Sequence, residues 1–537
     1  MGAPKCIVLL LIVISGFSTA SLAAIEEDVR TKCAFTRYPK LCVQTLTRLG
    51  LSGNQHVDFM SALVNKTISE INVPISKFEQ LSSHFVSEDA QLARIMDHCH
   101  ELLTMSIKWL NCSLVALRES PRKRKEEVQT WLSAAITFQQ TCKDAVEAQA
   151  PSNVFLAEIS RKMDYLSELT SNPLALVNQI PGNSKNKIFT GRHLLEEEFF
   201  PSWVPRSDRK LLQSKKIKAN VIVAKDGSGN YKTISGAIQA ATGSRFIIYV
   251  KSGIYNEKIN SNKYGIMLIG DGKYSTIITA SSSVAGGSML LDSATFKITG
   301  NGFIARDIGF QNTAGPQGAQ AVALAIASDL SVLYRCSISG YQDSLYAVSL
   351  RQFYRECDIY GTIDFIFGNA AAVIQSSNLI LRQPVVGAYN VILANGRTDP
   401  GQTTGFSIQN CKITVSSDFS PVKHSYKSYL GRPWKQFSRA VVMESNIGDA
   451  IAPQGWIEWP VANFFSYSTL YFAEYANTGP GAGTFGRVKW PGFHVIGETE
   501  AYKFTVDFID GTGWLPDTGV PFLPGLGGPI PADYSLN

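Results

Sequence analysis

The sequence repeats itself in two adjacent stretches, Cys336-Ser337-Ile338-Ser339-Gly340-Tyr341-Gln342-Asp343-Ser344-Leu345-Tyr346 and Cys357-Asp358-Ile359-Tyr360-Gly361-Thr362-Ile363-Asp364-Phe365-Ile366-Phe367. Both follow the pattern C-x-I-x-G-x-x-D-x-aliphatic-aromatic, and every matched position is 21 residues apart. An internal repeat of this length is typical of a solenoid in which each repeat forms one coil. The two stretches therefore predict neighbouring coils of a parallel β-helix.

The surrounding sequence extends this prediction in both directions. From Val221 onward, short β-branched and aromatic runs are separated by Gly, Asn and Asp, without helical periods of useful length. Parallel strands normally need crossovers of a dozen or more residues, whereas a solenoid coil returns each strand to the next layer. Weaker echoes of the repeat occur at Arg306-Asp307-Ile308 and Asn378-Leu379-Ile380. We expect an all-β parallel β-helix over residues 217–537.

Stacked coils bring equivalent residues of the repeat together. Adjacent strands lie about 4.8 Å apart, which is within the Cα separation of about 4.4–6.8 Å that disulfides span. The register therefore predicts a Cys336–Cys357 disulfide. The same register places Asp343 directly beside Asp364.

Two carboxylates this close cannot both ionise cheaply, so one pKa rises while the other stays low. Such a pair is suited to hydrolysis, with one acid and one nucleophile or base. A single Asp in a Gly-rich coil more often caps a turn, and a calcium site is another explanation for paired acids. Calcium needs several more oxygen ligands, and residues 365–367 supply none.

Ester hydrolysis also needs hydrogen-bond donors for an oxyanion and a cation beside the ionised carboxylate. Gln342 precedes Asp343, and Gln320 lies 22 residues earlier, close to one more coil. A lone strand Gln is ordinarily solvated, so spacing alone gives this role little support. Arg432 in Leu430-Gly431-Arg432-Pro433-Trp434 is a candidate for the cation, and Trp434 either stacks on a sugar ring or packs in the core.

The N-terminal half has a different sequence pattern. Residues 1–24 combine Lys5, an apolar run and a small-residue end, the pattern of a cleaved secretory signal peptide rather than a membrane anchor. Residues 25–180 have helix-period apolar positions and few glycines, which predicts an all-α bundle. The sequons at Asn65 and Asn111 predict glycosylation of a secreted surface.

A linker separates the two halves at residues 181–216. It contains prolines, an acidic run and a basic cluster, and its dibasic Arg209-Lys210-Leu211-Leu212 predicts cleavage after Lys210 or Leu212 by a processing protease. The formal net charge of +6 is concentrated in this linker. No broad basic face therefore indicates nucleic acid as a partner, while a weakly basic chain suits an acidic polysaccharide.

The nine cysteines suit a secreted protein, because disulfides persist in oxidising compartments. Cys6 leaves with the signal peptide, and Cys33 and Cys42 form a short-loop pair. Including this pair, five cysteines lie in the helical half and three in the β half, so complete pairing within each half is excluded. We expect Cys112 and Cys411 to remain unbridged.

The motifs of the β half occur together, in the same order, in a known family. The sequence closely resembles plant pectin methylesterases that carry an inhibitor-like pro-region. The resemblance rests on five motifs, Gly253-Ile254-Tyr255-Asn256-Glu257, Gln320-Ala321-Val322-Ala323-Leu324, Tyr341–Tyr346, Gly361–Ala370 and Leu430–Trp434. It implies a right-handed parallel β-helix, and for residues 25–180 a four-helix bundle of the inhibitor fold with disulfides Cys33–Cys42 and Cys99–Cys142.

The resemblance also implies roles for individual residues. Asp364 attacks the C6 carbonyl of a methyl-esterified galacturonate, Asp343 protonates the departing methanol, and Gln320 and Gln342 stabilise the oxyanion. Arg432 orients Asp364, and Trp434 lines the sugar subsite. No metal or organic cofactor is implied.

The implied enzyme is a pectinesterase that is secreted into the cell wall, with no membrane attachment after signal cleavage. Its implied partners are methyl-esterified homogalacturonan and a proteinaceous pectin methylesterase inhibitor.

Three positions depart from the pattern of that family, Leu290, Ala325 and Asn395. They remove no catalytic group but put substrate affinity and subsite preference in question. One alternative is a catalytically weak precursor that acts as an inhibitor or pectin-binding wall protein. A pectate lyase or polygalacturonase would need a further carboxylate or calcium cluster, and a serine esterase would need a Gly-x-Ser-x-Gly elbow; we find neither.

Overall fold

The structure is a computed structural model that describes residues 27–49, 56–85, 90–149, 154–181, 218–460 and 467–527. The chain divides into two compact units, Met1–Lys185 with Gly401–Thr403, and Asn186–Pro400 with Thr404–Asn537. The predicted signal peptide and the predicted cleavage site in the linker lie outside the described residues, and the domain boundaries remain predictions.

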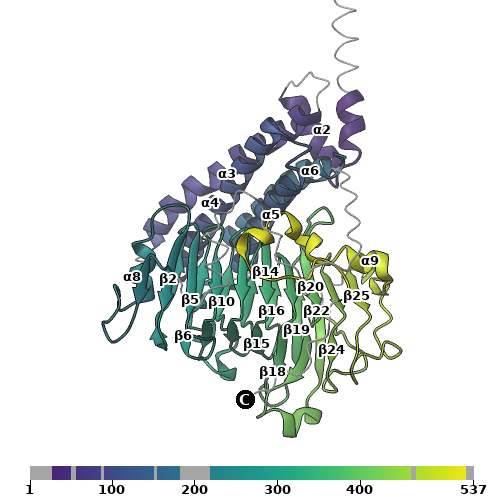
Figure 1. The fold of residues 1–537 in the computed structure, drawn as a ribbon. Coiled ribbons are helices and arrows are strands. Elements are labelled where there is room, and N and C mark those ends of the chain that lie inside the picture. The colour runs from purple at the N-terminus through teal and green to yellow at the C-terminus, as the bar shows by residue number, and fades with distance from the viewer. Residues whose placement is uncertain are drawn as a thin grey trace, which may run out of the picture. The chain divides into compact units, whose positions relative to one another are not determined.

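The first unit is helical, as expected. Four long helices pack in a ring in which each contacts two neighbours, forming a four-helix bundle, and a shorter helix precedes them (Figure 1). The helices are α2 (Pro39–Arg48), α3 (His56–Phe85), α4 (Ala90–Glu119), α5 (Lys125–Gln149) and α6 (Val154–Asn178). Apolar side chains such as Leu103, Leu132 and Leu166 are fully buried between the helices.

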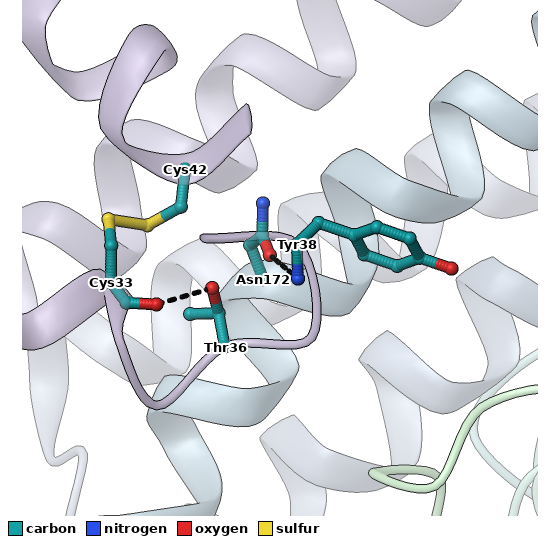
Figure 2. The surroundings of a disulfide bond; sticks show 5 residues. All are labelled: Cys33, Thr36, Tyr38, Cys42 and Asn172. Carbon is teal, nitrogen blue, oxygen red and sulfur yellow. Dashed lines mark hydrogen bonds between the residues drawn. A yellow bond between two sulfur atoms is a disulfide. The ribbon is translucent and has the colours of Figure 1, made fainter. Parts of the chain in front are cut away.

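Two disulfides brace the helical unit, and both are the predicted pairs. Cys33–Cys42 ties the chain before α2 to that helix, and Cys99–Cys142 joins α4 to α5. In the loop between Cys33 and Cys42, the Thr36 hydroxyl donates to the Cys33 carbonyl oxygen at 2.7 Å (Figure 2). The sequon residues Asn65 and Asn111 are exposed on α3 and α4; their glycosylation remains a prediction.

The second unit is a parallel β-helix of three sheets, in which every strand pairs with its neighbours in parallel and chain order follows the solenoid axis (Figure 1). Sheet A contains β1 (Val221–Val223), β2 (Phe246–Val250), β5 (Ile266–Gly270), β8 (Ile304–Arg306), β11 (Ser331–Tyr334), β14 (Arg351–Arg355), β17 (Ala371–Gln375), β20 (Gly405–Gln409), β23 (Arg439–Met443), β25 (Tyr471–Tyr475) and β26 (Phe493–Val495). Sheet B contains β3 (Gly253–Asn256), β6 (Thr276–Ala280), β9 (Gly309–Asn312), β12 (Ser337–Ser339), β15 (Asp358–Gly361), β18 (Asn378–Leu381), β21 (Lys412–Val415) and β24 (Asn446–Ile447). Sheet C contains β4 (Ile259–Ser261), β7 (Phe296–Ile298), β10 (Leu324–Ile326), β13 (Leu345–Ala347), β16 (Ile366–Gly368), β19 (Asn390–Asn395) and β22 (Ser428–Pro433).

The interior of the solenoid is a set of stacked aliphatic rows. In sheet B, Ile338 pairs with Ile359 and Ile359 with Leu379, and all three are fully buried in one core. Because side chains alternate along a strand, the residues between core positions face outward. The C-terminal segment, which begins with the short helix α9 (Glu498–Tyr502), packs apolar residues such as Val506 and Leu515 on the outer face of sheet A.

Two-residue turns join sheet A to sheet B in most coils. The first residue of each turn has a positive φ of about 50°, and these residues are Asp307, Arg335, Glu356, Ser376, Asn410 and Glu444. The second residue points into the coil, and this is where Cys336, Cys357 and Cys411 lie, all buried. The cysteines therefore serve as small side chains that fill the inside of a repeated turn.

The predicted Cys336–Cys357 disulfide is wrong, although the register that suggested it is correct. Both residues are unbridged thiols, and each contacts the carbonyl oxygen of the strand residue just before its turn, Tyr334 O at 3.6 Å and Arg355 O at 3.4 Å. Residues stacked in parallel strands have parallel Cα–Cβ bonds, so their Cβ atoms stay about 4.8 Å apart, whereas a disulfide needs about 3.8 Å. As expected, Cys112 and Cys411 are not bridged either.

Within the ranges given above, no helix combines the length and apolar character that a bilayer crossing requires.

Candidate active site

The two aspartates of the repeat lie on adjacent coils at equivalent positions. Asp343 is in the turn between β12 and β13, and Asp364 is in the turn between β15 and β16. The strands that flank these turns pair with the predicted offset of 21 residues, with Leu345 opposite Ile366. The Asp343 amide donates to the Ile363 carbonyl oxygen at 3.0 Å, which ties one turn to the next. The predicted stacking of the two acids is therefore present.

Both aspartates have a left-handed backbone, with φ of 63° at Asp343 and 50° at Asp364. Asp tolerates this conformation better than most residues. A glycine three residues earlier makes each turn compact: a Cβ on Gly361 would lie 2.1 Å from the Phe365 Cβ. The Gly-x-x-Asp spacing of the repeat is thus the local sequence that forms the turn.

Arg432 holds one member of the pair. Its Nε donates to Asp364 Oδ1 at 2.8 Å and its second terminal nitrogen donates to Asp364 Oδ2 at 2.6 Å. Arg432 lies in β22, two strands from β16, and pairs with Ala394 in the strand between them. The side chain of Ala394 is short, so the guanidinium reaches across that strand to the carboxylate.

Two aromatic residues hold Arg432 in turn. The Tyr389 hydroxyl accepts a hydrogen bond from Arg432 at 2.9 Å, and the guanidinium lies 4.2 Å from the centre of the Trp459 ring. Sequence reasoning missed both residues. Neither belongs to the repeat, and their positions follow from loops of different lengths, so the spacing carries no signal that would have found them.

The two carboxyl groups have different electrostatic surroundings. Burial raises the pKa of Asp343 well above its usual value, and the negative charge of Asp364 raises it further. Burial also raises the pKa of Asp364, but the Arg432 guanidinium opposes that rise by its charge and its hydrogen bonds. Asp364 is therefore the acid that ionises first, and Asp343 is the one that keeps its proton.

Gln320 and Gln342 are brought together on adjacent coils by an isolated parallel bridge. Both side chains are half-buried, and Gln342 directly precedes Asp343. Neither side-chain amide has a hydrogen-bond partner in the described part of the chain. Their N–H groups are thus available to a bound substrate beside the aspartate pair.

An aromatic row continues from the aspartates along the outer face of sheet C. The Tyr346 and Phe367 rings stack with centroids 4.2 Å apart, and Trp434 meets Phe367 edge to face at 6.0 Å. Trp434 is half-buried and packs over Gly396, where a Cβ would lie 2.9 Å from its ring. Trp434 therefore packs against the coil and stays partly exposed, and its stacking on a sugar ring remains a prediction.

The three unusual positions lie in different environments. Asn395 is buried, donates to the Gly368 carbonyl oxygen at 3.2 Å and accepts from the Arg439 amide at 2.9 Å, so it braces the backbone. Ala325 lies in β10 beside Tyr346 of β13, on the outer face. Leu290 precedes a short 3₁₀ helix, Leu291–Ser293, and its carbonyl oxygen accepts from the Ser293 hydroxyl.

Among the described residues, Asp343 and Asp364 do not belong to any group of three His, Cys or acidic side chains with metal-ligand spacing. The donor set around the pair therefore does not suit calcium, which takes six to eight oxygen ligands. The neighbours are aromatic rings, two amides and one guanidinium.

Comparison with known proteins gives consistent matches. Residues 220–512 match the Pectinesterase family, and residues 27–176 match the Plant invertase/pectin methylesterase inhibitor family. The chain is 48% identical to "Probable pectinesterase/pectinesterase inhibitor 54" of Arabidopsis thaliana, over 92% of each chain. It is 44% identical to "Pectinesterase 2" of Citrus sinensis, over 98% of this chain and 100% of that one. Among solved structures, "Pectin methylesterase from Carrot" matches with a TM-score of 0.57 and 52% identity, covering 58% of this chain and 100% of that one.

Proposed function

Because the chain belongs to the pectinesterase family, we propose that it hydrolyses the methyl esters of cell-wall homogalacturonan, with Asp364 as nucleophile and Asp343 as acid and base. The observation that carries this proposal is the unequal pair: two buried, stacked carboxyls of which Arg432 pairs with only Asp364. A nucleophile must be ionised and a general acid must be protonated. The pair meets both requirements at the same pH.

In the first step, a carboxylate oxygen of Asp364 attacks the C6 carbonyl carbon of an esterified galacturonate. The carbonyl oxygen becomes an oxyanion and accepts hydrogen bonds from Gln320 and Gln342. When the tetrahedral intermediate collapses, the bond from C6 to the methoxy oxygen breaks. Asp343 gives its proton to that oxygen, and methanol leaves an acyl group on Asp364.

In the second step, the ionised Asp343 removes a proton from a water molecule as the water attacks the acyl carbon. The bond between that carbon and the Asp364 oxygen then breaks. The products are a galacturonic acid carboxyl group, ionised Asp364 and protonated Asp343. The new carboxyl group then releases its remaining proton to solvent, and the cycle closes without a redox partner or cofactor.

Arg432 serves as a positioning residue in this scheme. Its hydrogen bonds hold the Asp364 carboxylate in one orientation, and the Tyr389 hydroxyl and Trp459 ring restrain the guanidinium. A bidentate guanidinium fixes geometry more strictly than a point charge does. Trp434 is the proposed sugar-stacking residue, because part of its ring remains exposed.

The test is methanol release from highly esterified pectin by the full-length protein. We expect Asp364→Asn to reduce kcat by about 1,000-fold or more, since the amide is a poor nucleophile. Asp226→Asn, at an exposed turn of the same unit, is the matched control and should leave activity unchanged. Wild-type activity in Asp364→Asn would refute the mechanism.

We also propose that the chain is secreted to the cell wall and cleaved in the linker near Arg209-Lys210, with the helical unit restraining or escorting the enzyme until then. The sequence of residues 1–24 and the inhibitor-family match of residues 27–176 support this. Mass spectrometry of the protein from cell walls should find a mature N-terminus near residue 211. An uncleaved precursor as active as the processed form would contradict the restraint.

The alternative, a weak precursor that acts mainly as an inhibitor or pectin-binding protein, makes a different prediction for the same assay. It requires negligible methanol release by the processed wild-type protein. The complete set of Asp343, Asp364, Gln320, Gln342 and Arg432 favours the enzyme.

A further inference from the structure

Tyr341, Thr362 and Arg382 occupy equivalent positions in three successive coils. Each lies two residues past an aligned position of the paired strands β12, β15 and β18. The Thr362 amide donates to the Tyr341 carbonyl oxygen at 2.9 Å. The Arg382 amide donates to the Gly361 carbonyl oxygen at 2.8 Å. Hydrogen bonds between coils therefore continue past the strands of sheet B into the turns that carry the two aspartates.

Arg382 holds Tyr341 by three contacts. Its guanidinium carbon lies 3.8 Å from the centre of the Tyr341 ring, and one terminal nitrogen donates to the Tyr341 hydroxyl at 2.7 Å. The other terminal nitrogen donates to the Gly340 carbonyl oxygen at 2.9 Å. A guanidinium combines a flat face with several donors, so it can contact a ring and bind oxygens at once. One side chain thus fixes the ring, the hydroxyl and the backbone at the start of the Asp343 turn.

The reach of Arg382 matches that of Arg432 at the other acid. Arg382 crosses Thr362, a small buried residue, to a partner two coils away. Arg432 likewise crosses Ala394 to Asp364, two strands away. Each of the two aspartate turns is therefore held by its own arginine, one from the end of sheet B and one from sheet C.

Two residues of the proposed reaction follow Tyr341 directly. Gln342 is the proposed oxyanion donor, and Asp343 is the proposed acid and base, with a left-handed φ of 63°. The Tyr341 carbonyl oxygen also accepts from the Ser344 hydroxyl at 3.2 Å, so Tyr341 is tied to both ends of the turn. A shift of Tyr341 would therefore rotate the peptide that leads to both functional groups.

We propose that Arg382 is a positioning residue, which fixes Tyr341 and thereby holds Gln342 and Asp343 where they meet the substrate. This inference rests on the proposed function, because it assigns Arg382 to the reaction of that site. Gln342 and Asp343 act on the oxyanion and on the leaving oxygen, whose charges develop in the transition state. Loss of Arg382 should therefore lower kcat and leave KM nearly unchanged.

The first test compares Arg382→Met with wild type in the full-length protein, by methanol release from highly esterified pectin. Arg382 is only partly buried, so its replacement leaves the core intact. We expect kcat to fall about 30-fold and KM to stay within about twofold of wild type, since a displacement of about 1 Å can cost about 100-fold in rate. Arg382→Lys keeps the charge but loses the forked donors, so its kcat should be intermediate. This second variant answers the same question if Arg382→Met does not fold.

Arg355→Met is the matched control. Arg355 donates to the side chains of Gln375 and Ser376 at 2.9 Å each, at the turns between sheets A and B rather than between sheets B and C. Its loss should lower the melting temperature and leave kcat unchanged. An equal fall of kcat in Arg355→Met and Arg382→Met, or wild-type kcat in Arg382→Met, would overturn the proposal.

A double-mutant cycle shows whether Arg382 acts through Tyr341. If it does, Arg382→Met should reduce kcat little further in a Tyr341→Leu background, although it reduces kcat strongly in the wild-type background. Independent, additive losses would contradict an effect that passes through Tyr341.

A measurement without catalysis separates this inference from the proposed function. Hydrogen exchange of the backbone amides of residues 341–344 reports how firmly the turn is held. We expect faster exchange in Arg382→Met than in wild type and Arg355→Met, whether or not methanol is released. Equal exchange in all three proteins refutes the inference, whereas wild-type protein that releases no methanol from pectin contradicts the proposed function alone.

Discussion

Asp343 and Asp364 share a backbone conformation, a depth of burial and a place in the repeat, so their different roles must come from a third residue. Arg432 forms three hydrogen bonds with Asp364, whereas the pKa of Asp343 is raised by burial and by the charge of Asp364. Two buried acids this close cannot both be charged, so Asp364 carries the charge and Asp343 stays neutral. Division of labour in the proposed site depends on a single guanidinium.

Replacement of Arg432 should shift the pH dependence of the enzyme. In Arg432→Gln the cation that opposes the raised pKa of Asp364 is lost, so that pKa rises and ionised nucleophile appears only at higher pH. We expect the acidic limb of the kcat/KM profile to move to higher pH, with kcat at the optimum reduced about 100-fold. An acidic limb at the wild-type position would show that Arg432 does not control Asp364.

The raised pKa of Asp343 should cost stability at neutral pH. When an acid has a higher pKa in the folded protein than in the unfolded one, its contribution to the free energy of unfolding is fully present below the unfolded pKa, near 3.8. That contribution is lost as pH rises through the folded pKa. Asp343→Asn removes this loss, so we expect the β-helix to melt at least ~2 °C higher than wild type at pH 7. The advantage should shrink as pH falls toward 4; a difference independent of pH would exclude titration of Asp343 as its cause.

At the scale of elements, the catalytic geometry belongs to a turn rather than to a strand. The turns between sheets B and C carry both aspartates, and the parallel pairing of β13 with β16 and of β12 with β15 keeps the turns in register. Each strand forms one layer of the solenoid, and its hydrogen-bonded neighbours fix its position along the solenoid axis. Neither turn can therefore move without the strands that flank it. The solenoid therefore makes a rigid site from short connections.

Gly361 is the position at which this turn is most sensitive. A Cβ there would lie 2.1 Å from the Phe365 Cβ and 2.7 Å from the Tyr341 carbonyl oxygen. We expect Gly361→Ala to lower the free energy of unfolding by about 1–3 kcal/mol and to reduce kcat, since Asp364 follows three residues later. Gly483→Ala, where a Cβ meets nothing within 4 Å, is the control, and denaturant titration with methanol release measures both. A neutral effect of Gly361→Ala would mean that the turn relaxes freely.

At the scale of the whole molecule, the two units are stabilised by different means. The helical unit has two disulfides, whereas the described residues of the β-helix contain three unbridged cysteines and a stacked aliphatic core. The two units should therefore respond differently to a reductant, which breaks covalent cross-links but leaves hydrophobic layers intact.

Reduction should therefore weaken the helical unit selectively. Cys99–Cys142 closes a separation of 43 residues, and loss of such a link costs about 2–5 kcal/mol. In scanning calorimetry of the full-length protein with reductant, the helical transition should shift down while the β-helix transition stays in place. Cys112→Ser without reductant is the control and should change neither transition. A shift of the β-helix transition would imply a disulfide there after all.

The repeat period could be read from the sequence because it is a local, periodic property. A coil of 21 residues places Asp343 beside Asp364 whatever the rest of the chain does, so the fold class and the core of the candidate site were predictable. The same reasoning failed at Cys336 and Cys357, because the register that stacks two residues also keeps their Cα–Cβ bonds parallel, which leaves the Cβ atoms too far apart for a disulfide.

Only the tertiary structure decided which groups surround the pair. Tyr389 and Trp459 reach Arg432 from loops of unequal length, so their convergence depends on how the coils pack and not on any period in the chain. The sequence by itself determined that two acids would meet, and its resemblance to a known family implied that Arg432 holds Asp364. Three-dimensional packing determined that Tyr389 and Trp459 restrain the guanidinium, because such contacts depend on distance and angle in space.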